Sequence, residues 1–249
     1  MAIREGVVIN VGEGDYLSYP RYGFQFFCFR SPEMVQEMNM FIKYAKGKRC
    51  LFDIGAYHGM FSLVFTSLNN DGISFAFEPF KMQLEVISRI KNDRIFCYDY
   101  ALSDRNETVP MFDYDGHLEF KKRVDIQSEY TCETITGDYF YSHYPHQLKP
   151  DILKIDVEGA EFLVLRGMKK VIEQNFPLIF LETHPYFLKS DWKDELQDLI
   201  DRYNYKIKHT QTDEFISVKD VHKMNENEIR IILFHEPDRE LFNRYMEFK

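Results

Sequence analysis

Residues 50–59 form the stretch Cys50-Leu51-Phe52-Asp53-Ile54-Gly55-Ala56-Tyr57-His58-Gly59, an apolar run that ends in a glycine-containing turn. A segment of helical period follows, and ligands bind at such strand–turn–helix units in parallel α/β sheets. Gly55 allows the tight turn, and Gly59 allows a close contact with the helix. Asp53 suits a ligand with an ammonium group better than one with a pyrophosphate. By itself the unit is equally consistent with an ordinary turn in which Asp53 caps the helix.

Outward from this unit, short apolar runs alternate with helical segments, which is typical of a parallel sheet covered by helices on both faces. We predict strands at 50–54, 73–78, 95–100, 152–155 and 178–182, and helices at 60–68, 82–91 and 160–174. A helix at 192–203 and runs at 205–208, 215–218 and 229–234 follow, and the last two are expected to pair antiparallel through the turn 223–228. The predicted fold class is α/β, a doubly wound and mostly parallel sheet with an antiparallel edge strand.

The alternation begins only at residue 49, which divides the chain into two predicted parts. Residues 1–48, with a helix near 33–44, are expected to form an N-terminal cap or lid on a domain spanning 49–249. Residues 108–136 interrupt the alternation with charged, β-like sequence. This predicts a β-rich insertion at a carboxyl-end loop, where substrate-recognising segments usually lie.

Composition restricts the class of protein. The 249 residues are 45% hydrophobic and 29% charged, which excludes disordered, collagenous and small disulfide-stapled classes. A net charge of −9 without basic clusters argues against a nucleic-acid partner. Four scattered cysteines, the lack of an apolar leader and the shortness of every apolar run predict a reduced, cytoplasmic protein with no membrane span. The oligomeric state stays open, with a homodimer as one option.

A second acid supports a ligand site. Glu78 ends the predicted strand at 73–78, where a carboxylate can accept both hydroxyls of an adenosine ribose, and Pro79 ends that strand. Nicotinamide cofactors use the same acidic position, but they require G-x-G-x-x-G in the first turn, where Tyr57 replaces the second glycine. The one Tyr-x-x-x-Lys, from Tyr44 to Lys48, precedes the first strand. An NAD(P)-dependent oxidoreductase is therefore the alternative rather than the first choice.

At this point the chain resembles the FkbM family of S-adenosylmethionine-dependent methyltransferases, over residues 50–184. Six ordered blocks carry the resemblance: Phe52-Asp53-Ile54-Gly55-Ala56-x-x-Gly59, Phe77-Glu78-Pro79, Ala101-Leu102-Ser103-Asp104, Thr134-Ile135-x-x-Asp138-Tyr139-Phe140, Leu153-Lys154-Ile155-Asp156-Val157-Glu158-Gly159-Ala160-Glu161 and Leu181-Glu182-x-His184. The resemblance implies a class I methyltransferase fold, which is Rossmann-like, and S-adenosyl-L-methionine as the cofactor.

The resemblance also implies positions for that cofactor. It places the turn after the first strand beside the methionine part, Glu78 at the ribose and residues 100–103 by the adenine. The full cofactor-binding set is then Asp53, Gly55, Ala56, Tyr57, Gly59, Glu78, Pro79, Ala101, Ser103 and Asp156. The family usually has Asn where this chain has Tyr57, which leaves the contact of that side chain open while the backbone turn need not change.

Read from its residues, the segment 151–161 is a strand that delivers Asp156 to the carboxyl edge of the sheet, followed by a helix with Glu158 and Glu161 in its first turn. Negative charge there complements the helix dipole, and we assign Glu161 to that role. Asp156 could favour the sulfonium charge of a methyl donor, hold an acceptor hydroxyl or ligate a metal. Lys154, inside the strand, is either a site residue or part of a buried ion pair.

Glu182 and His184 close the next strand, so we expect them beside Asp156. Methyl transfer to an alcohol needs a base or a metal near the hydroxyl, and His184 is the best-placed base. The predicted catalytic set is His184, Asp156, Glu182 and Lys154, and a divalent metal, if present, would use Asp156, Glu182 and His184. The alternative for His184 is a loop histidine without a role.

Four other histidines are expected in loops and turns: His58 in the turn before the helix at 60–68, His117 in a turn of the insertion, and His143 and His146 in a solvated loop. An Asn/Asp-Pro-Pro-aromatic run, typical of enzymes that methylate nucleobase amino groups, is missing after the fourth strand. We therefore predict an O-methyltransferase whose small-molecule or carbohydrate acceptor offers a hydroxyl of a sugar, glycan or glycan precursor. The sugar acceptor comes from family analogy, and a non-catalytic S-adenosylmethionine-binding protein is a further alternative.

Overall fold

The structure is a computed structural model. It describes the backbone of residues 2–3, 6–10, 15–19, 24–26, 32–88, 92–114, 117–119, 130–143, 148–224 and 227–236, with side chains in 32–88, 92–112, 130–143, 148–224 and 227–236. Within these ranges, no helix combines the length and apolar character that a membrane crossing requires.

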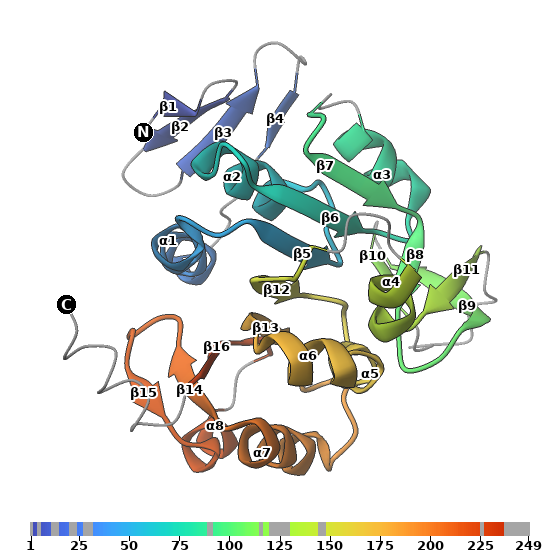
Figure 1. The fold of residues 1–249 in the computed structure, drawn as a ribbon, viewed down its shortest axis with the longest axis vertical. Coiled ribbons are helices and arrows are strands. Elements are labelled where there is room, and N and C mark those ends of the chain that lie inside the picture. The colour runs from blue at the N-terminus through green and yellow to red at the C-terminus, as the bar shows by residue number, and fades with distance from the viewer. Residues whose placement is uncertain are drawn as a thin grey trace.

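An eight-stranded sheet forms the centre of the molecule, in the order β15-β14-β16-β13-β12-β5-β6-β7 (Figure 1). The strands from β13 to β7 are parallel, whereas β16 runs antiparallel to both β13 and β14. This confirms the predicted α/β class with an antiparallel edge. The strand bounds are β5 Cys50–Ile54, β6 Ile73–Phe77, β7 Ile95–Tyr98, β12 Ile152–Ile155, β13 Leu178–Thr183, β14 Tyr205–His209, β15 Phe215–Ile216 and β16 Ile229–His235.

Helices cover both faces because successive side chains of a strand point to opposite sides. Leu51 of β5 belongs to the apolar cluster that includes side chains of α1 and α2, and its neighbour Phe52 belongs to the cluster on the other face, which includes side chains of α4 to α8. The parallel strands are therefore apolar at almost every position, as expected for a sheet buried on both sides. The helix bounds are α1 Pro32–Ala45, α2 Met60–Leu68, α3 Lys81–Ser88, α4 Gly137–His143, α5 Glu161–Gly167, α6 Lys169–Asn175, α7 Trp192–Tyr203 and α8 Val218–Lys223.

Two smaller sheets flank the central one (Figure 1). One has the order β10-β9-β11-β8 and consists of β8 Tyr100–Leu102, β9 Glu107–Tyr114, β10 His117–Glu119 and β11 Tyr130–Ile135. The other is an antiparallel sheet of β1 Ala2–Ile3, β2 Gly6–Asn10, β3 Asp15–Tyr19 and β4 Phe24–Phe26. Helix α1, which belongs to the segment predicted as a cap, buries Phe41 and Met38 against the central sheet.

Two predicted elements are divided in the structure. The expected strand at 95–100 splits at Asp99, because β8 leaves the central sheet and pairs with β11. The expected helix at 160–174 splits at Met168, where the chain turns after Gly167. A Cβ atom on Gly167 would lie 1.9 Å from the carbonyl oxygen of Ser103, so α5 ends in close contact with the end of β8.

The expected antiparallel pairing of 215–218 with 229–234 is wrong. Only Phe215 and Ile216 are extended, and they pair with β14, which in turn pairs with β16. The chain then enters α8, because Ser217 and Asp220 form a reciprocal capping box that satisfies the first N–H groups of the helix. This Ser-x-x-Asp pattern is a local signal for a helix start, and it overrides the short β-like run.

Candidate active site

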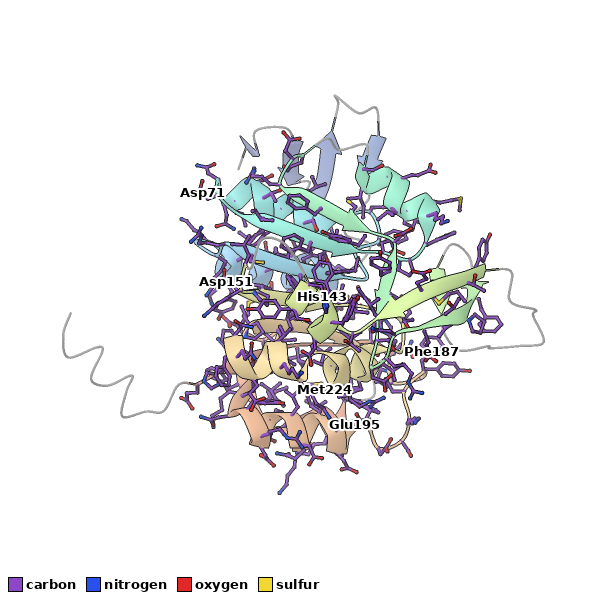
Figure 2. All side chains as sticks on the ribbon, turned by 45° about the vertical axis from the view of Figure 1, so that its right-hand side comes forward. Asp71, His143, Asp151, Phe187, Glu195 and Met224 are labelled. Carbon is purple, nitrogen blue, oxygen red and sulfur yellow. The ribbon has the colours of Figure 1, made fainter. Side chains whose placement is uncertain are left out.

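The carboxyl ends of the parallel strands face one side of the molecule. Asp71 and Asp151 precede β6 and β12, and Figure 2 shows both on the side opposite Phe187, which follows β13. In open α/β sheets ligands bind outside these carboxyl ends. Every residue predicted for catalysis lies within or directly after β12 or β13, and so at or near this edge.

The turn after β5 is held between its two neighbouring strands. The N–H groups of Gly55 and Ala56 both donate to the carbonyl oxygen of Phe77, at 3.0 Å. Gly55 has a φ of 78°, and a Cβ atom there would lie 1.7 Å from the carbonyl oxygen of Asp156. Only glycine fits this position, for both backbone and spatial reasons. Gly59, at φ 73°, similarly abuts Ile87 of α3.

Glu78 is tied to the same turn. Its Oε2 accepts a hydrogen bond from the N–H of Tyr57 at 2.8 Å, and its Oε1 accepts one from the N–H of Phe80 at 2.9 Å, across Pro79. Burial raises the pKa of Glu78 to about 7, against the lowering effect of these two bonds. The carboxylate is therefore oriented by backbone, and each oxygen keeps a further lone pair for another donor.

Asp53 contacts the start of helix α2, which is the capping role that the sequence suggested as the alternative to ligand binding. Its carboxylate is 1% exposed, and Oδ2 accepts from the N–H and the hydroxyl of Ser62, at 3.0 and 2.6 Å. Ser62 lies in the first turn of α2, so Asp53 does satisfy the start of that helix. Burial raises the pKa of Asp53 to about 6.

The predicted adenine side lies on β8. Ala101 is buried and stands opposite Thr134 of β11. Ser103 is also buried, and its N–H donates to the carbonyl oxygen of Ile135 at 2.9 Å. The sheet of β8 to β11 thus begins just after β7, the strand that follows Glu78 in the chain.

Lys154 is buried and forms ion pairs with three carboxylates next to the site. Its Nζ lies 3.2 Å from Glu37, 3.4 Å from Asp156 and 3.3 Å from Glu182. Burial lowers the pKa of Lys154, but the three carboxylates outweigh burial and raise the pKa above its usual range. Arg230 of β16 completes the network, since it contacts Glu37 at 3.3 Å and forms a short ion pair with Glu182.

His184 is surrounded by three carboxylates. Its Nδ1 lies 2.7 Å from Glu161, while its Nε2 lies 3.5 Å from Glu158 and 3.9 Å from Asp156. Burial lowers the pKa of His184, but the hydrogen bond that Nδ1 donates to Glu161 and the other negative charges raise it to about 10. The imidazole is therefore cationic at neutral pH, and Nε2 has to lose its proton before it can act as a base or bind a metal ion.

The structure thus brings together all four residues of the predicted catalytic set. Sequence reasoning missed Glu37 and Arg230 and treated Glu161 only as a helix cap, although it does accept from the N–H of Gly159 at 2.9 Å. One signal pointed to further partners: a Lys in an apolar strand needs carboxylates on its own face of the sheet, but this requirement does not identify Glu37 or Arg230.

Two of these four histidines have described side chains. His143 ends helix α4 and does not lie in the expected loop; its ring stacks on that of Tyr139, with the centroids 4.1 Å apart. The rings of His58 and Tyr57 are tilted against each other, with the centroids 3.9 Å apart. His117 lies in strand β10 and not in the expected turn, and only its backbone is described; His146 and Cys28 lie outside the described residues. Cys50, Cys97 and Cys132, which are described, are free thiols.

The family model of the methyltransferase FkbM domain matches residues 53–207, which includes every residue around Lys154 and His184 described above except Glu37 and Arg230. The chain belongs to the FkbM methyltransferase family. Across 151 residues this FkbM chain is 24% identical to the hexuronic acid methyltransferase AglP of Haloferax volcanii. The match covers 59% of this chain and 61% of the relative, so the chain spans less than two thirds of that protein.

Solved structures show the same fold at low identity. A methyltransferase FkbM from Methylobacillus flagellatus is 16% identical, with a TM-score of 0.50 over 75% of this FkbM chain and 43% of the other. A putative rRNA methylase from Clostridium thermocellum is 12% identical, with a TM-score of 0.51 over 84% of this chain and 98% of the other. The fold of this family member is therefore the class I methyltransferase fold.

Proposed function

We propose that this protein is an S-adenosylmethionine-dependent O-methyltransferase whose acceptor is a hydroxyl of a sugar, glycan or glycan precursor. One observation carries the proposal: the predicted donor and acceptor residues lie side by side at one edge of the sheet. The turn after β5 and Glu78 after β6 lie next to Asp156 after β12 and His184 after β13. A donor site and an acceptor site must be neighbours for transfer between them. The carbohydrate acceptor is supported by the relative that acts on a hexuronic acid.

The residues of the turn fit the cofactor. Glu78 is buried with a backbone N–H on each oxygen, which orients the carboxylate for a pair of ribose hydroxyls. The fit does not depend on the unusual Tyr57 side chain, because Tyr57 contributes its N–H group to this arrangement. We assign Gly55, Ala56 and Asp53 to the methionine side, and Ala101 and Ser103 to the adenine side. When bound, S-adenosylmethionine supplies an electrophilic methyl group.

The acceptor side is assigned to Asp156 and His184. Burial acts to raise the pKa of Asp156, but Lys154 and His184 outweigh it, so the pKa lies below its usual range and the group is ionised. Its side chain is 31% exposed, more than Lys154 or Glu182, so it is the member of this network that an acceptor can reach. We propose that Asp156 accepts the hydrogen bond of the acceptor hydroxyl. Lys154 and Glu182 hold Asp156 in position.

The experiment that tests this is a calorimetric titration of the full chain with S-adenosylhomocysteine, beside a titration with NADH. We expect micromolar binding of the first and none of the second, with binding lost in Glu78→Ala and weakened in Asp53→Ala. Binding of NADH instead would support the oxidoreductase alternative. Transfer of a labelled methyl group to a panel of hexoses and hexuronic acids then separates an enzyme from a non-catalytic binder, since the binder would bind the ligand without turnover.

A further inference from the structure

We propose that Asp156, Glu158 and His184 bind one divalent cation beside the acceptor hydroxyl, an inference that rests on the proposed function. These three side chains come from the loop after β12 and the loop after β13. One ligand atom from each lies within 4.8 Å of the others.

The distances fit a shared ion better than direct hydrogen bonds. His184 Nε2 lies 3.5 Å from Glu158 Oε2 and 3.9 Å from Asp156 Oδ1. Both distances exceed the range of about 2.7–3.2 Å for an N–H···O hydrogen bond. Two ligands about 2.1 Å from one ion are separated by about 3.0 Å when they are about 90° apart and by about 3.4 Å when they are about 110° apart. The observed spacing therefore leaves room for an ion between the three groups.

His184 is oriented for ligation by a group outside the ligand set. The residue is 4% exposed, and its Nδ1 is held at 2.7 Å by Glu161, which is fully buried. A carboxylate on one nitrogen of a metal-ligating histidine fixes the ring and aims the other nitrogen at the ion. The Glu161 carboxylate is itself fixed by the N–H of Gly159.

The two loops are packed so that their ligands face one another. A Cβ atom on Gly159 would lie 2.4 Å from Cβ of Phe187, so the backbone after Glu158 touches the loop that carries His184. Gly159 has a φ of 101°, which other residues rarely adopt. The contact between Gly159 and Phe187 holds the two loops together next to Glu158 and His184.

The structure changes the ligand set that the sequence predicted. Glu182 has one oxygen 3.3 Å from Lys154 and the other on Arg230, so both oxygens already face buried cations. Glu158 takes its place in the proposed set, because its oxygen lies on the side of the ring that faces Asp156. A second possible set, Glu182, His184 and Glu228, is the one that the experiment must distinguish.

Two carboxylates and one imidazole suit a first-row divalent ion such as Mn²⁺. Three protein ligands leave further coordination positions for water and for an oxygen of the acceptor. Such an ion would lower the pKa of a sugar hydroxyl bound to it, so the hydroxyl would release its proton to water more readily as its oxygen attacks the methyl carbon. The C–O bond would form as the methyl–sulfur bond breaks, and the electron pair of that bond would stay on sulfur.

The test uses the full chain after treatment with a chelator, titrated with Mn²⁺ alone and followed by electron paramagnetic resonance of the free ion. We expect one Mn²⁺ per chain, with affinity weakened about tenfold or more in Glu158→Gln. The matched control is Glu228→Gln, which makes the same chemical change in the competing ligand set. Both side chains reach solvent, so both variants should fold, and thermal melting checks this.

The outcomes separate this inference from the proposed function. Wild type that binds S-adenosylhomocysteine but no Mn²⁺ would overturn the metal site and leave the methyltransferase proposal standing. Weakened Mn²⁺ binding in Glu228→Gln, with normal binding in Glu158→Gln, would overturn the assigned ligands. Mn²⁺ binding without binding of S-adenosylhomocysteine would support the metal site and contradict the proposed function.

Discussion

Glu78 shows how one buried residue can make ligand binding depend on pH. Its pKa is raised to about 7 because the folded chain buries the carboxylate. A raised pKa means that the folded state holds the proton more tightly than the unfolded chain, so ionisation of Glu78 costs stability as the pH rises toward 7. A ribose needs the ionised form as its acceptor. Affinity and stability therefore change in opposite directions over this interval.

We accordingly expect the dissociation constant of S-adenosylhomocysteine to rise about tenfold per pH unit below pH 7. Calorimetry between pH 5.5 and 8 measures this. Glu78→Gln serves as the control: its binding should be weak, and any pH dependence that remains should centre near pH 6, where Asp53 titrates. An unchanged affinity of the wild type across this range would show that Glu78 does not hold the ligand in its charged form.

Tyr57 is a second residue whose effect can be isolated. It has a φ of 48°, in the left-handed region that a bulky residue adopts at a cost of about 1–2 kcal/mol and that Asn tolerates. We expect Tyr57→Asn to stabilise the protein by about 1 kcal/mol, a rise in Tm of about 2–4 °C. Tyr57→Phe, which keeps the backbone cost, should change the stability by less than about 0.5 kcal/mol. Equal Tm values for Asn and Phe would exclude backbone strain as the cause.

At the scale of elements, the Lys154 network joins helix α1 to strands β12, β13 and β16. Removing one member of a buried ion pair typically costs about 3–5 kcal/mol, because its partners stay buried and unpaired. We expect a loss of this size for Lys154→Met, measured by urea denaturation. The double variant Glu37→Gln/Lys154→Met should recover part of the loss, since it removes one unpaired carboxylate. A double variant less stable than the single one would contradict this.

The contact between α5 and β8 gives a second prediction for elements. A Cβ atom on Gly167 would collide with the backbone of Ser103, whereas one on Gly47 would meet no atom within 4 Å. Gly167→Ala should therefore cost about 1–3 kcal/mol through displacement of α5. Gly47→Ala should cost about 1 kcal/mol of stability, and only because the backbone φ of 81° is unfavourable for alanine. Thermal unfolding compares the two, and a larger loss at Gly47 would mean that the α5 contact adjusts freely.

For the whole molecule, the proposed function divides the sheet edge into a donor half, after β5 and β6, and an acceptor half, after β12 and β13. We expect Asp156→Asn to lower the rate of methyl transfer about a hundredfold or more while S-adenosylhomocysteine binds nearly as before. Equal losses of binding and rate would place Asp156 in the donor half. That residues 1–48 act as a cap, and 108–136 as a substrate-recognising insertion, stays a prediction.

The central sheet was predictable because its signals are local. Apolar alternation, the Gly55 turn and Asp53 at the strand end are visible in a window of ten residues, and they mark β5 and α2 at their observed bounds. The failure at 215–218 was also local, since the capping box at Ser217 competed with a short β-like run. The break at Gly167 was different, because its cause is the backbone of Ser103, far away in the chain.

The α/β class, the family and the two strand ends that carry Glu78 and Asp156 could be predicted from the residues alone, since hydrophobic periodicity and glycine turns act over short distances. Which charges meet depends on how distant parts of the chain fold together. Glu37 and Arg230 reach Lys154 and Glu182 from opposite ends of the chain, and Glu161 reaches His184 across two loops. The energy of a buried charge depends on all of its neighbours at once, and no local pattern records those neighbours.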